Sequence, residues 1–180
     1  MKRTAFVIFS LTAVLAATTA YAQETPAPGS EVGKLSYFAG NWTSDATIAP
    51  GPWGAGGKFT DTAHAEWMKG NFFLVDHSDF SMPAELGGSG TSMQVIGYDS
   101  ETGNYTEERF DSAGHHVSLT GKLAGSTWTW TGNANYGGMP MQVRFTITVV
   151  SPTSYTSKYE ISADGGTTWM PFWEGKATKQ

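Results

Sequence analysis

Cysteine is absent from the 180-residue chain. A protein without thiols forms no disulfide, no thiolate metal site and no covalent haem attachment, and it cannot use thiol catalysis. Charged residues are also scarce, at 15%, and no cluster of Lys and Arg provides the positive footprint that nucleic acids require. We therefore expect a fold held together by packing alone, with no cofactor and no nucleic-acid partner.

The N-terminus has the order of a cleavable secretory signal at residues 1–22. Lys2 and Arg3 form a short positive region, residues 5–17 are almost wholly apolar, and Ala20-Tyr21-Ala22 supplies the small residues of a cleavage site. The apolar stretch is shorter than the roughly 20 residues that span a bilayer. We expect export to the periplasm or the medium after cleavage near Ala22, with no membrane anchor.

Removal of this signal makes the mature chain more acidic. Nine Lys and Arg then stand against 16 Asp and Glu, a net charge of −7, which disfavours an anionic membrane as partner. Residues 23–30 are polar and rich in proline, which indicates a flexible leader. Residues 31–180 are expected to form a single domain.

Composition and turn signals favour β structure in this domain. Residues 31–38 form the only plausible helix, with Val32, Leu35 and Phe38 at helical spacing. Beyond residue 40, turn residues separate about ten short segments with strand patterning. The predicted strands are residues 42–47, 59–68, 71–80, 89–98, 104–111, 115–123, 126–131, 141–150, 154–162 and 170–178.

The connections between these strands predict how they pair. Most loops have hairpin length and none contains a crossover helix, so antiparallel pairing is expected. A long meander with one apolar face removes its exposed edges by closing on itself. The prediction is an all-β fold: an antiparallel up-and-down barrel of about ten strands, with a short helix before it.

One hairpin can be followed residue by residue. If Lys69 and Gly70 form a two-residue turn, Trp67 lies opposite Phe72. The two strands then share a more apolar face, which is expected to point inward. That face carries Phe59, Asp61, Ala63, Ala65, Trp67, Phe72, Leu74, Asp76, Ser78 and Phe80.

This register places two carboxylates inside the barrel. Asp61 would lie beside Ser78, and Asp76 opposite Ala63. Buried carboxylates need partners, and Arg109 or Arg144 is expected to supply one.

The order of several motifs resembles known families. Gly40-Asn41-Trp42 is the Gly-x-Trp mark of the calycin superfamily, which includes lipocalins and fatty-acid-binding proteins. The whole mature domain is similar to a bacterial family of unknown function, domain of unknown function 1579 (DUF1579). The likeness lies in Leu35, Gly40-x-Trp42, Gly70-Asn71-Phe72-Phe73-Leu74, Gly97-Tyr98-Asp99, Tyr105, Asp111, Gly138-Met139-Pro140, Val143-Arg144 and Trp173-Glu174. This resemblance implies a lipocalin-like barrel and brings no established activity.

Two positions depart from the family pattern. Phe110 stands where the family usually has Trp, and Lys176 stands where it tends to have Arg in the last strand. In lipocalins such an Arg packs over the indole of the Gly-x-Trp motif. Lys176 is expected to stack on Trp42 in the same way, without the forked contacts of Arg.

Histidines provide the candidate metal and haem ligands. His64 and His77 would be diagonal neighbours, on the face that also carries Glu66 and Asp79, close enough to share a divalent metal. The favoured interpretation is a solvated outer face, because the opposite face is more apolar. Of the adjacent pair His115-His116, at most one faces inward as a conceivable axial haem ligand.

Acid–base catalysis needs a positioned pair with separated pKa values. Glu107, Glu108 and Asp111 cluster near Arg109 and are expected to form ion pairs on the strand surface. No Gly-x-Ser-x-Gly elbow and no phosphate-cradling loop occurs in the sequence.

The aromatic residues indicate the barrel interior as the site. A barrel of ten strands is wide enough to hold a ligand instead of being filled by side chains. The candidate ligand-binding residues combine aromatic rings with a few charged groups: Trp42, Asp61, Trp67, Phe72, Asp76, Arg109, Trp128, Trp130, Arg144 and Tyr159.

Three functions remain open, and the sequence does not indicate an oligomeric state. The preferred one is an exported barrel that binds a small apolar or amphipathic ligand, and it predicts an apolar cavity with few perturbed ionisable groups. The second is an enzyme of the isomerase or lyase type, which predicts a buried carboxylate with a raised pKa beside a donor. The third is a structural or partner-binding domain, which predicts a filled barrel and an exposed apolar patch.

Overall fold

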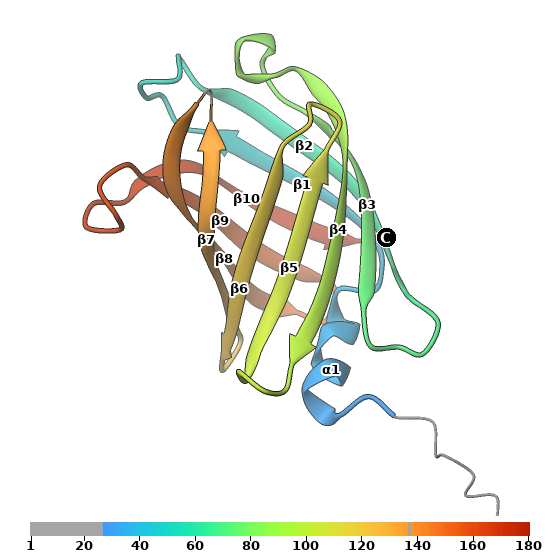
Figure 1. Cartoon of the computed structure of the whole chain (residues 1–180). Coiled ribbons are helices and arrows are strands. Elements are labelled where there is room, and N and C mark those ends of the chain that lie inside the picture. Colours follow the sequence, from blue (N-terminus) through green and yellow to red (C-terminus); the bar gives the residue numbers. More distant parts are fainter. Residues whose placement is uncertain (1–26, 137) are drawn as a thin grey trace, which may run out of the picture.

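Residues 27–136 and 138–180 are described by a computed structural model (Figure 1). The predicted signal at residues 1–22 and the first part of the leader lie outside this range. The described chain forms a closed barrel of ten antiparallel strands, which confirms the predicted fold class. The strands are β1 (Gly40–Ile48), β2 (Gly57–Trp67), β3 (Leu74–Ser81), β4 (Ser89–Asp99), β5 (Asn104–Asp111), β6 (His116–Ala124), β7 (Thr127–Tyr136), β8 (Met139–Ser151), β9 (Ser154–Ser162) and β10 (Met170–Lys179).

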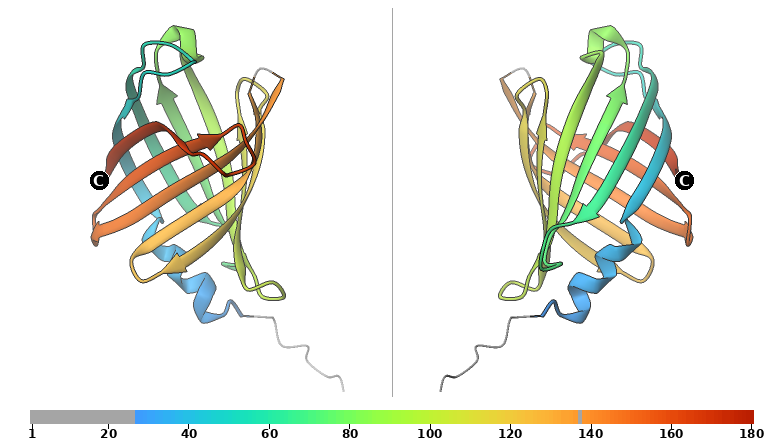
Figure 2. Two further views of the ribbon diagram at one scale, coloured as in Figure 1. Left: turned by 90° about the vertical axis from the view of Figure 1, so that its left-hand side faces the viewer. Right: turned by 90° about the vertical axis from the view of Figure 1, so that its right-hand side faces the viewer.

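Each strand pairs with its neighbours in the chain, and β1 pairs with β10 to close the barrel. The closing register runs from Trp42 opposite Lys179 to Ile48 opposite Trp173. Closure gives every strand two partners, so the described sheet leaves no free edge. Figures 1 and 2 show the strands running obliquely around the barrel axis.

A short helical segment covers one end of the barrel, as Figure 2 shows. It consists of α1 (Ser30–Lys34) and the 3₁₀ helix η1 (Leu35–Tyr37), close to the predicted helix. The side chain of Leu35 is fully buried. The Tyr37 hydroxyl donates to the Ser151 carbonyl at 3.0 Å and the Ser154 carbonyl at 2.9 Å, which ties the segment to the β8–β9 turn. We call this the closed end.

The β2–β3 turn differs from the prediction. The loop spans residues 68–73, and Trp67 lies opposite Leu74, not Phe72. Gly70 and Asn71 both have positive φ, a conformation that Gly and Asn adopt at low cost. The longer loop moves the register by two residues. Because side chains alternate with period two, the predicted inner face of the strands is retained.

The new register changes the cross-strand neighbours of the two carboxylates. Asp76 lies opposite Ala65, not Ala63, and Asp61 lies opposite Phe80. Ser78 instead lies opposite Ala63.

The residue over the Trp42 indole is Lys179 and not Lys176. The Lys179 Nζ lies 5.3 Å from the ring centroid and donates to the Tyr37 carbonyl at 3.3 Å. Trp173 and Ala177 of β10 face inward with Lys179, so Lys176 points outward and is exposed. The alternation of side chains along β10 therefore decides which lysine can stack.

Lys179→Ala is expected to lower the free energy of unfolding by about 1 kcal/mol, because it removes a cation–π contact at a partly desolvated ring. The matched change Lys176→Ala removes an exposed side chain, so its effect should stay within about 0.5 kcal/mol. Urea unfolding followed by tryptophan fluorescence compares the two variants. A larger loss for Lys176→Ala would contradict this assignment.

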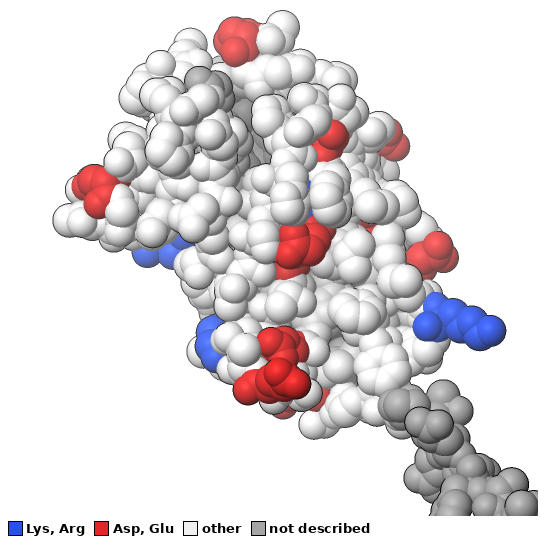
Figure 3. All heavy atoms as spheres, in the orientation of Figure 1, with Lys and Arg blue, Asp and Glu red and all other residues white. Residues whose placement is uncertain are grey.

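The outer surface carries few charges. On the face shown in Figure 3, Asp and Glu are scattered and the Lys and Arg side chains lie apart from one another. Among residues 27–136 and 138–180, no helix has the length and apolar character needed to cross a bilayer.

Candidate functional site

A cavity of about 330 Å³ lies inside the barrel. It extends from Phe38 and Leu119 toward the end opposite α1, where Leu86, Gly87 and Ala113 line it from the loops after β3 and β5. We call this second end the mouth. The barrel is therefore filled at the closed end and hollow toward the mouth.

Aromatic packing fills the closed end. Trp128 is 2% exposed and its ring centroid lies 5.3 Å from that of Phe38 and 4.7 Å from that of Tyr105. Trp130 stacks on Trp128 with ring centroids 6.1 Å apart. Gly121 lies opposite Trp130, and a Cβ at Gly121 would collide with this indole. The glycine thus leaves room for the largest side chain of the core.

Two unlike walls enclose the cavity. Strands β2 to β5 supply what we call the polar wall: Asp61, Asp76, Ser78, Ser92, Gln94, Glu107 and Arg109. Strands β7 to β10 supply what we call the aromatic wall: Trp130, Tyr136, Phe145, Tyr155, Tyr159, Phe172 and Trp173. Strands β2 and β3 also bring Phe59 and Phe80 into the cavity, so a molecule inside the barrel would meet the carboxylates and the guanidinium on one side and ring faces mainly on the other.

An ion pair lies at the centre of the polar wall. Arg109 Nη2 donates to Glu107 Oε1 at 2.8 Å and to Gln94 Oε1 at 3.1 Å. The Glu107 side chain is 2% exposed, whereas 26% of the Arg109 side chain remains accessible. The Arg109 guanidinium also lies 5.8 Å from the centroid of the Phe145 ring. Arg109 therefore touches both walls.

The other two carboxylates of the polar wall have no such partner. Among the described residues, neither Asp61 nor Asp76 lies within ion-pair distance of a Lys, Arg or His, and Asp76 Oδ1 is buried without a hydrogen-bond partner. Burial raises the pKa of Asp76 to about 6; the Asp61 carboxylate adds to this rise and the Arg109 guanidinium opposes it. Burial also raises the pKa of Asp61.

The aromatic wall carries a hydroxyl pair. Tyr136 and Tyr159 hydrogen-bond through their hydroxyls at 2.8 Å. Burial raises the pKa of both phenols, that of Tyr159 well above its ordinary value. Both phenols stay protonated at neutral pH; one donates to the other within the pair, and the second keeps its O–H free to donate elsewhere. Tyr159 also stacks on Trp173, with centroids 5.8 Å apart.

Six of the ten predicted ligand-binding residues line the cavity: Trp42, Asp61, Asp76, Arg109, Trp130 and Tyr159. The structure does not place the other four there. Trp128 is buried in the closed end, Trp67 ends β2 and packs on the core there, and Phe72 belongs to the β2–β3 loop.

The prediction that Arg144 binds the ligand inside the barrel is wrong, because its side chain points outward. Its neighbours Val143 and Phe145 face inward, so alternation along β8 turns Arg144 outward. There its Nε donates to Glu160 Oε2 at 2.7 Å, and its guanidinium lies 4.2 Å from the Trp169 ring centroid. Arg109 is therefore the arginine that accompanies the interior carboxylates.

Glu107 is expected from the sequence to lie on the surface together with Glu108 and Asp111, but it lines the interior. Glu107 and Asp111 share the inner face of β5 with Tyr105 and Arg109, whereas Glu108 lies outside and binds His116 at 2.7 Å. The period-two pattern of Tyr105, Glu107, Arg109 and Asp111 was the signal that could have shown this. Other missed liners are Gln94, Tyr136, Phe145, Tyr155 and Trp173.

His64 and His77 do not form the site. His64 and His77 lie directly opposite each other on the outer face, not diagonally, and both are exposed. His64 Nδ1 pairs with Asn41 Oδ1 at 2.6 Å. Within the described part of the chain, no three His, Cys, Asp or Glu side chains are grouped so that they could hold a metal.

The side chains of His115 and His116 point to opposite faces of the sheet, as expected for adjacent residues. His115 lines the mouth and pairs with Asp111 Oδ2 at 2.8 Å, whereas His116 stacks on Phe110 outside. His115 thus has a carboxylate partner at the rim of the cavity.

Solved structures with the same fold have little sequence in common with this chain. Rv2717c from M. tuberculosis superposes with a TM-score of 0.58 at 10% identity, over 84% of this chain and 98% of that chain. The S-type phycobiliprotein lyase CPES from Guillardia theta superposes with a TM-score of 0.54 at 10% identity, over 84% and 93% of the two chains. At such identities the likeness concerns the fold alone.

A search of curated proteins finds no match to this sequence. The family described as "Protein of unknown function (DUF1579)" matches residues 27–179, nearly the whole of the domain predicted to be mature. The calycin-like barrel and the motifs along it agree with that match. The chain therefore belongs to the DUF1579 family.

Proposed function

We propose that this protein binds a small amphipathic molecule inside the barrel. The observation that carries the proposal is the two-sided cavity, with its polar wall on β2 to β5 and its aromatic wall on β7 to β10. Ligand sites are commonly hollows of about 300–1,000 Å³, mostly apolar, with a few placed polar groups. The volume of about 330 Å³ suits a molecule of about two fused rings with one polar substituent.

The walls suggest how such a molecule would lie. Its ring system would stack against Tyr159 and Trp173, where aromatic area gives the largest gain from burial. Its polar substituent would face Asp76 and Arg109 across the cavity. Entry is expected at the mouth, because aromatic packing blocks the closed end.

Titration calorimetry with 1-naphthalenemethanol, a neutral amphipathic probe, tests this proposal. We expect saturable one-to-one binding to the wild type. Ala63 lines the cavity, so Ala63→Phe should fill part of it and weaken binding by about tenfold or more. Thr62→Phe places the same ring on the exposed outer face next to it and should leave binding unchanged.

Circular dichroism shows whether both variants keep the β fold. A wild type that binds no probe, or a folded Ala63→Phe variant that binds as well as Thr62→Phe, would overturn binding in the cavity.

One observation favours a second candidate, an enzyme that uses Asp76 as a general base. A carboxyl with a pKa of about 6, in a cavity that also holds the Tyr136 and Tyr159 hydroxyls, is suited to proton abstraction beside a carbonyl. Deuterium exchange at the α-carbon of 2-tetralone in D₂O, followed by NMR, tests this. We expect the wild type and the control Asp79→Asn to accelerate this exchange, and Asp76→Asn to leave it at the uncatalysed rate.

The sequence also supports a site of action outside the cytoplasm. The proposal is that residues 1–22 direct export and that the mature chain begins near Gln23. The intact mass of protein recovered from the periplasm or the medium measures the cleavage point. An uncleaved chain confined to the cytoplasm would contradict it.

A further inference from the structure

We infer that the polar group of the bound molecule is a cation, such as a protonated amine. This inference rests on the proposed function and adds the class of ligand. It starts from the charge balance of the polar wall, where Asp61, Asp76 and Glu107 stand against a single cation, Arg109. Arg109 Nη2 is already hydrogen-bonded to Glu107 and Gln94.

Asp61 and Asp76 are the cavity carboxylates without an ion-pair partner among the described residues. Asp76 lines the cavity and its Oδ1 has no hydrogen-bond partner, while Asp61 lines it from the neighbouring strand β2. A carboxylate removed from water needs a donor or an opposite charge to offset its desolvation. A ligand ammonium group supplies both, with up to three N–H donors.

Aromatic rings near these carboxylates add to the attraction for a cationic group. Phe59 flanks Asp61 on the inner face of β2 and stacks on Trp173 with centroids 5.4 Å apart. Tyr155 and Trp42 also line the cavity, with ring centroids 5.0 Å apart. Ring faces attract cations, and more so where water is excluded.

An anionic ligand fits the same cavity less well. It would meet three carboxylates on the polar wall against one guanidinium. Arg109 Nε is buried without a hydrogen-bond partner, but the charge of this guanidinium is already balanced by Glu107 at 2.8 Å. Asp111 adds another carboxylate toward the mouth, where His115 pairs with it. The field along the entry path and at the wall therefore favours positive over negative ligands.

The same groups predict how binding depends on pH. The groups that act on Asp76 are Asp61 of β2, Glu107 and Arg109 of β5, and the adjacent His77. Burial raises the pKa of Tyr155 of β9, and the nearby carboxylates of Asp61 and Asp76 add to this rise. Protonation of Asp76 at low pH removes negative charge, so amine binding should weaken between pH 7.5 and pH 5, while binding of a neutral analogue should not.

Three probes of nearly equal shape separate the inference from the proposed function: 1-naphthylmethylamine, 1-naphthalenemethanol and 1-naphthoic acid. At pH 7.5 we expect calorimetry to show the amine bound about tenfold or more tighter than the alcohol, and the acid weakest. Asp76→Asn and Asp61→Asn should each bring amine affinity toward that of the alcohol. An amide can still hydrogen-bond a hydroxyl but cannot supply a negative charge, so both variants should lower amine affinity by a much larger factor than alcohol affinity.

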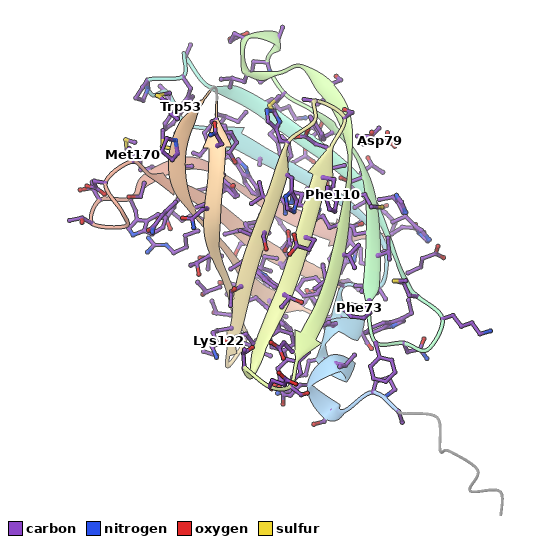
Figure 4. The ribbon with its side chains drawn as sticks, viewed as in Figure 1. Trp53, Phe73, Asp79, Phe110, Lys122 and Met170 are labelled. Atoms are coloured by element: carbon purple, nitrogen blue, oxygen red, sulfur yellow. The ribbon has the colours of Figure 1, made fainter. Side chains whose placement is uncertain are left out.

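Asp79→Asn is the matched control, because Asp79 lies on β3 like Asp76 but projects away from the barrel (Figure 4). It should change none of the three affinities. Alcohol binding without preference for the amine, or tighter binding of the acid, overturns the cationic ligand and leaves the proposed function standing. Failure of all three probes to bind the wild type overturns both.

Discussion

Replacing Arg109 with methionine is expected to lower the free energy of unfolding by about 3–5 kcal/mol at pH 7.5. Arg109 is the only cation on the polar wall, and its loss leaves Glu107 buried without its partner at 2.8 Å. It also removes the positive charge that opposes the raised pKa of Asp61 and Asp76. Three uncompensated carboxylates then share one low-dielectric cavity.

Urea unfolding of Arg109→Met against Arg144→Met measures this effect. Arg144 pairs with Glu160 on the outer face, where the two side chains are 32% and 9% exposed. Lys158 Nζ also lies 3.2 Å from Glu160, so Glu160 keeps a cation and the removal of Arg144 should cost about 1 kcal/mol. The loss for Arg109→Met should shrink at pH 5, because protonation neutralises carboxylates whose pKa is raised. Equal losses for the two variants would show that the interior pair is not the stronger electrostatic contact.

Adding Glu107→Leu to Arg109→Met should restore part of the lost stability. The double variant replaces a buried ion pair with two apolar side chains, which is often neutral or stabilising, whereas the single variant leaves a charge without its partner. A double variant less stable than Arg109→Met alone would contradict this explanation.

Asp76→Asn is expected to stabilise the protein by about 3 kcal/mol at pH 8. The pKa of Asp76 rises from 3.8 to about 6 in the folded protein. Below pH 4 the carboxyl is protonated in both the folded and the unfolded chain, so the folded protein bears no penalty. As the pH rises through 6, the Asp76 carboxyl ionises inside the folded protein. The stability that its protonated form contributed is then lost. Asparagine keeps the shape without this charge.

Urea unfolding at a series of pH values measures how the stability gain from Asp76→Asn depends on pH. The gain from Asp76→Asn should be full at pH 8 and should vanish near pH 4, while the exposed Asp79→Asn should stay within about 0.5 kcal/mol throughout. A gain that does not change with pH would point to packing and not to ionisation. If Asp76→Asn both weakens amine binding and raises stability in a pH-dependent way, then Asp76 destabilises the folded protein and serves ligand binding.

The barrel and the inward faces of its strands could be predicted from the residues alone. Glycine-rich turns at hairpin spacing delimited ten strands, and the alternation in β2 and β3 assigned Asp61 and Asp76 to the interior. Both conclusions rest on local physics: turn residues with positive φ, and side chains that alternate with period two. A register error of two residues at Gly70 and Asn71 did not disturb them, because an even shift preserves the face.

Which of the inward residues share the cavity depends on how the strands are placed in the closed barrel. Trp128 and Trp130 lie two residues apart on the same face of β7, yet Trp130 lines the cavity and Trp128 fills the closed end beneath it. Glu107 and Arg109 depend on barrel closure to face Asp61, Asp76 and the aromatic wall. Alternation along one strand gives a side chain its direction, but its height in the barrel and its partners across the interior follow from register, closure and the helix that covers one end.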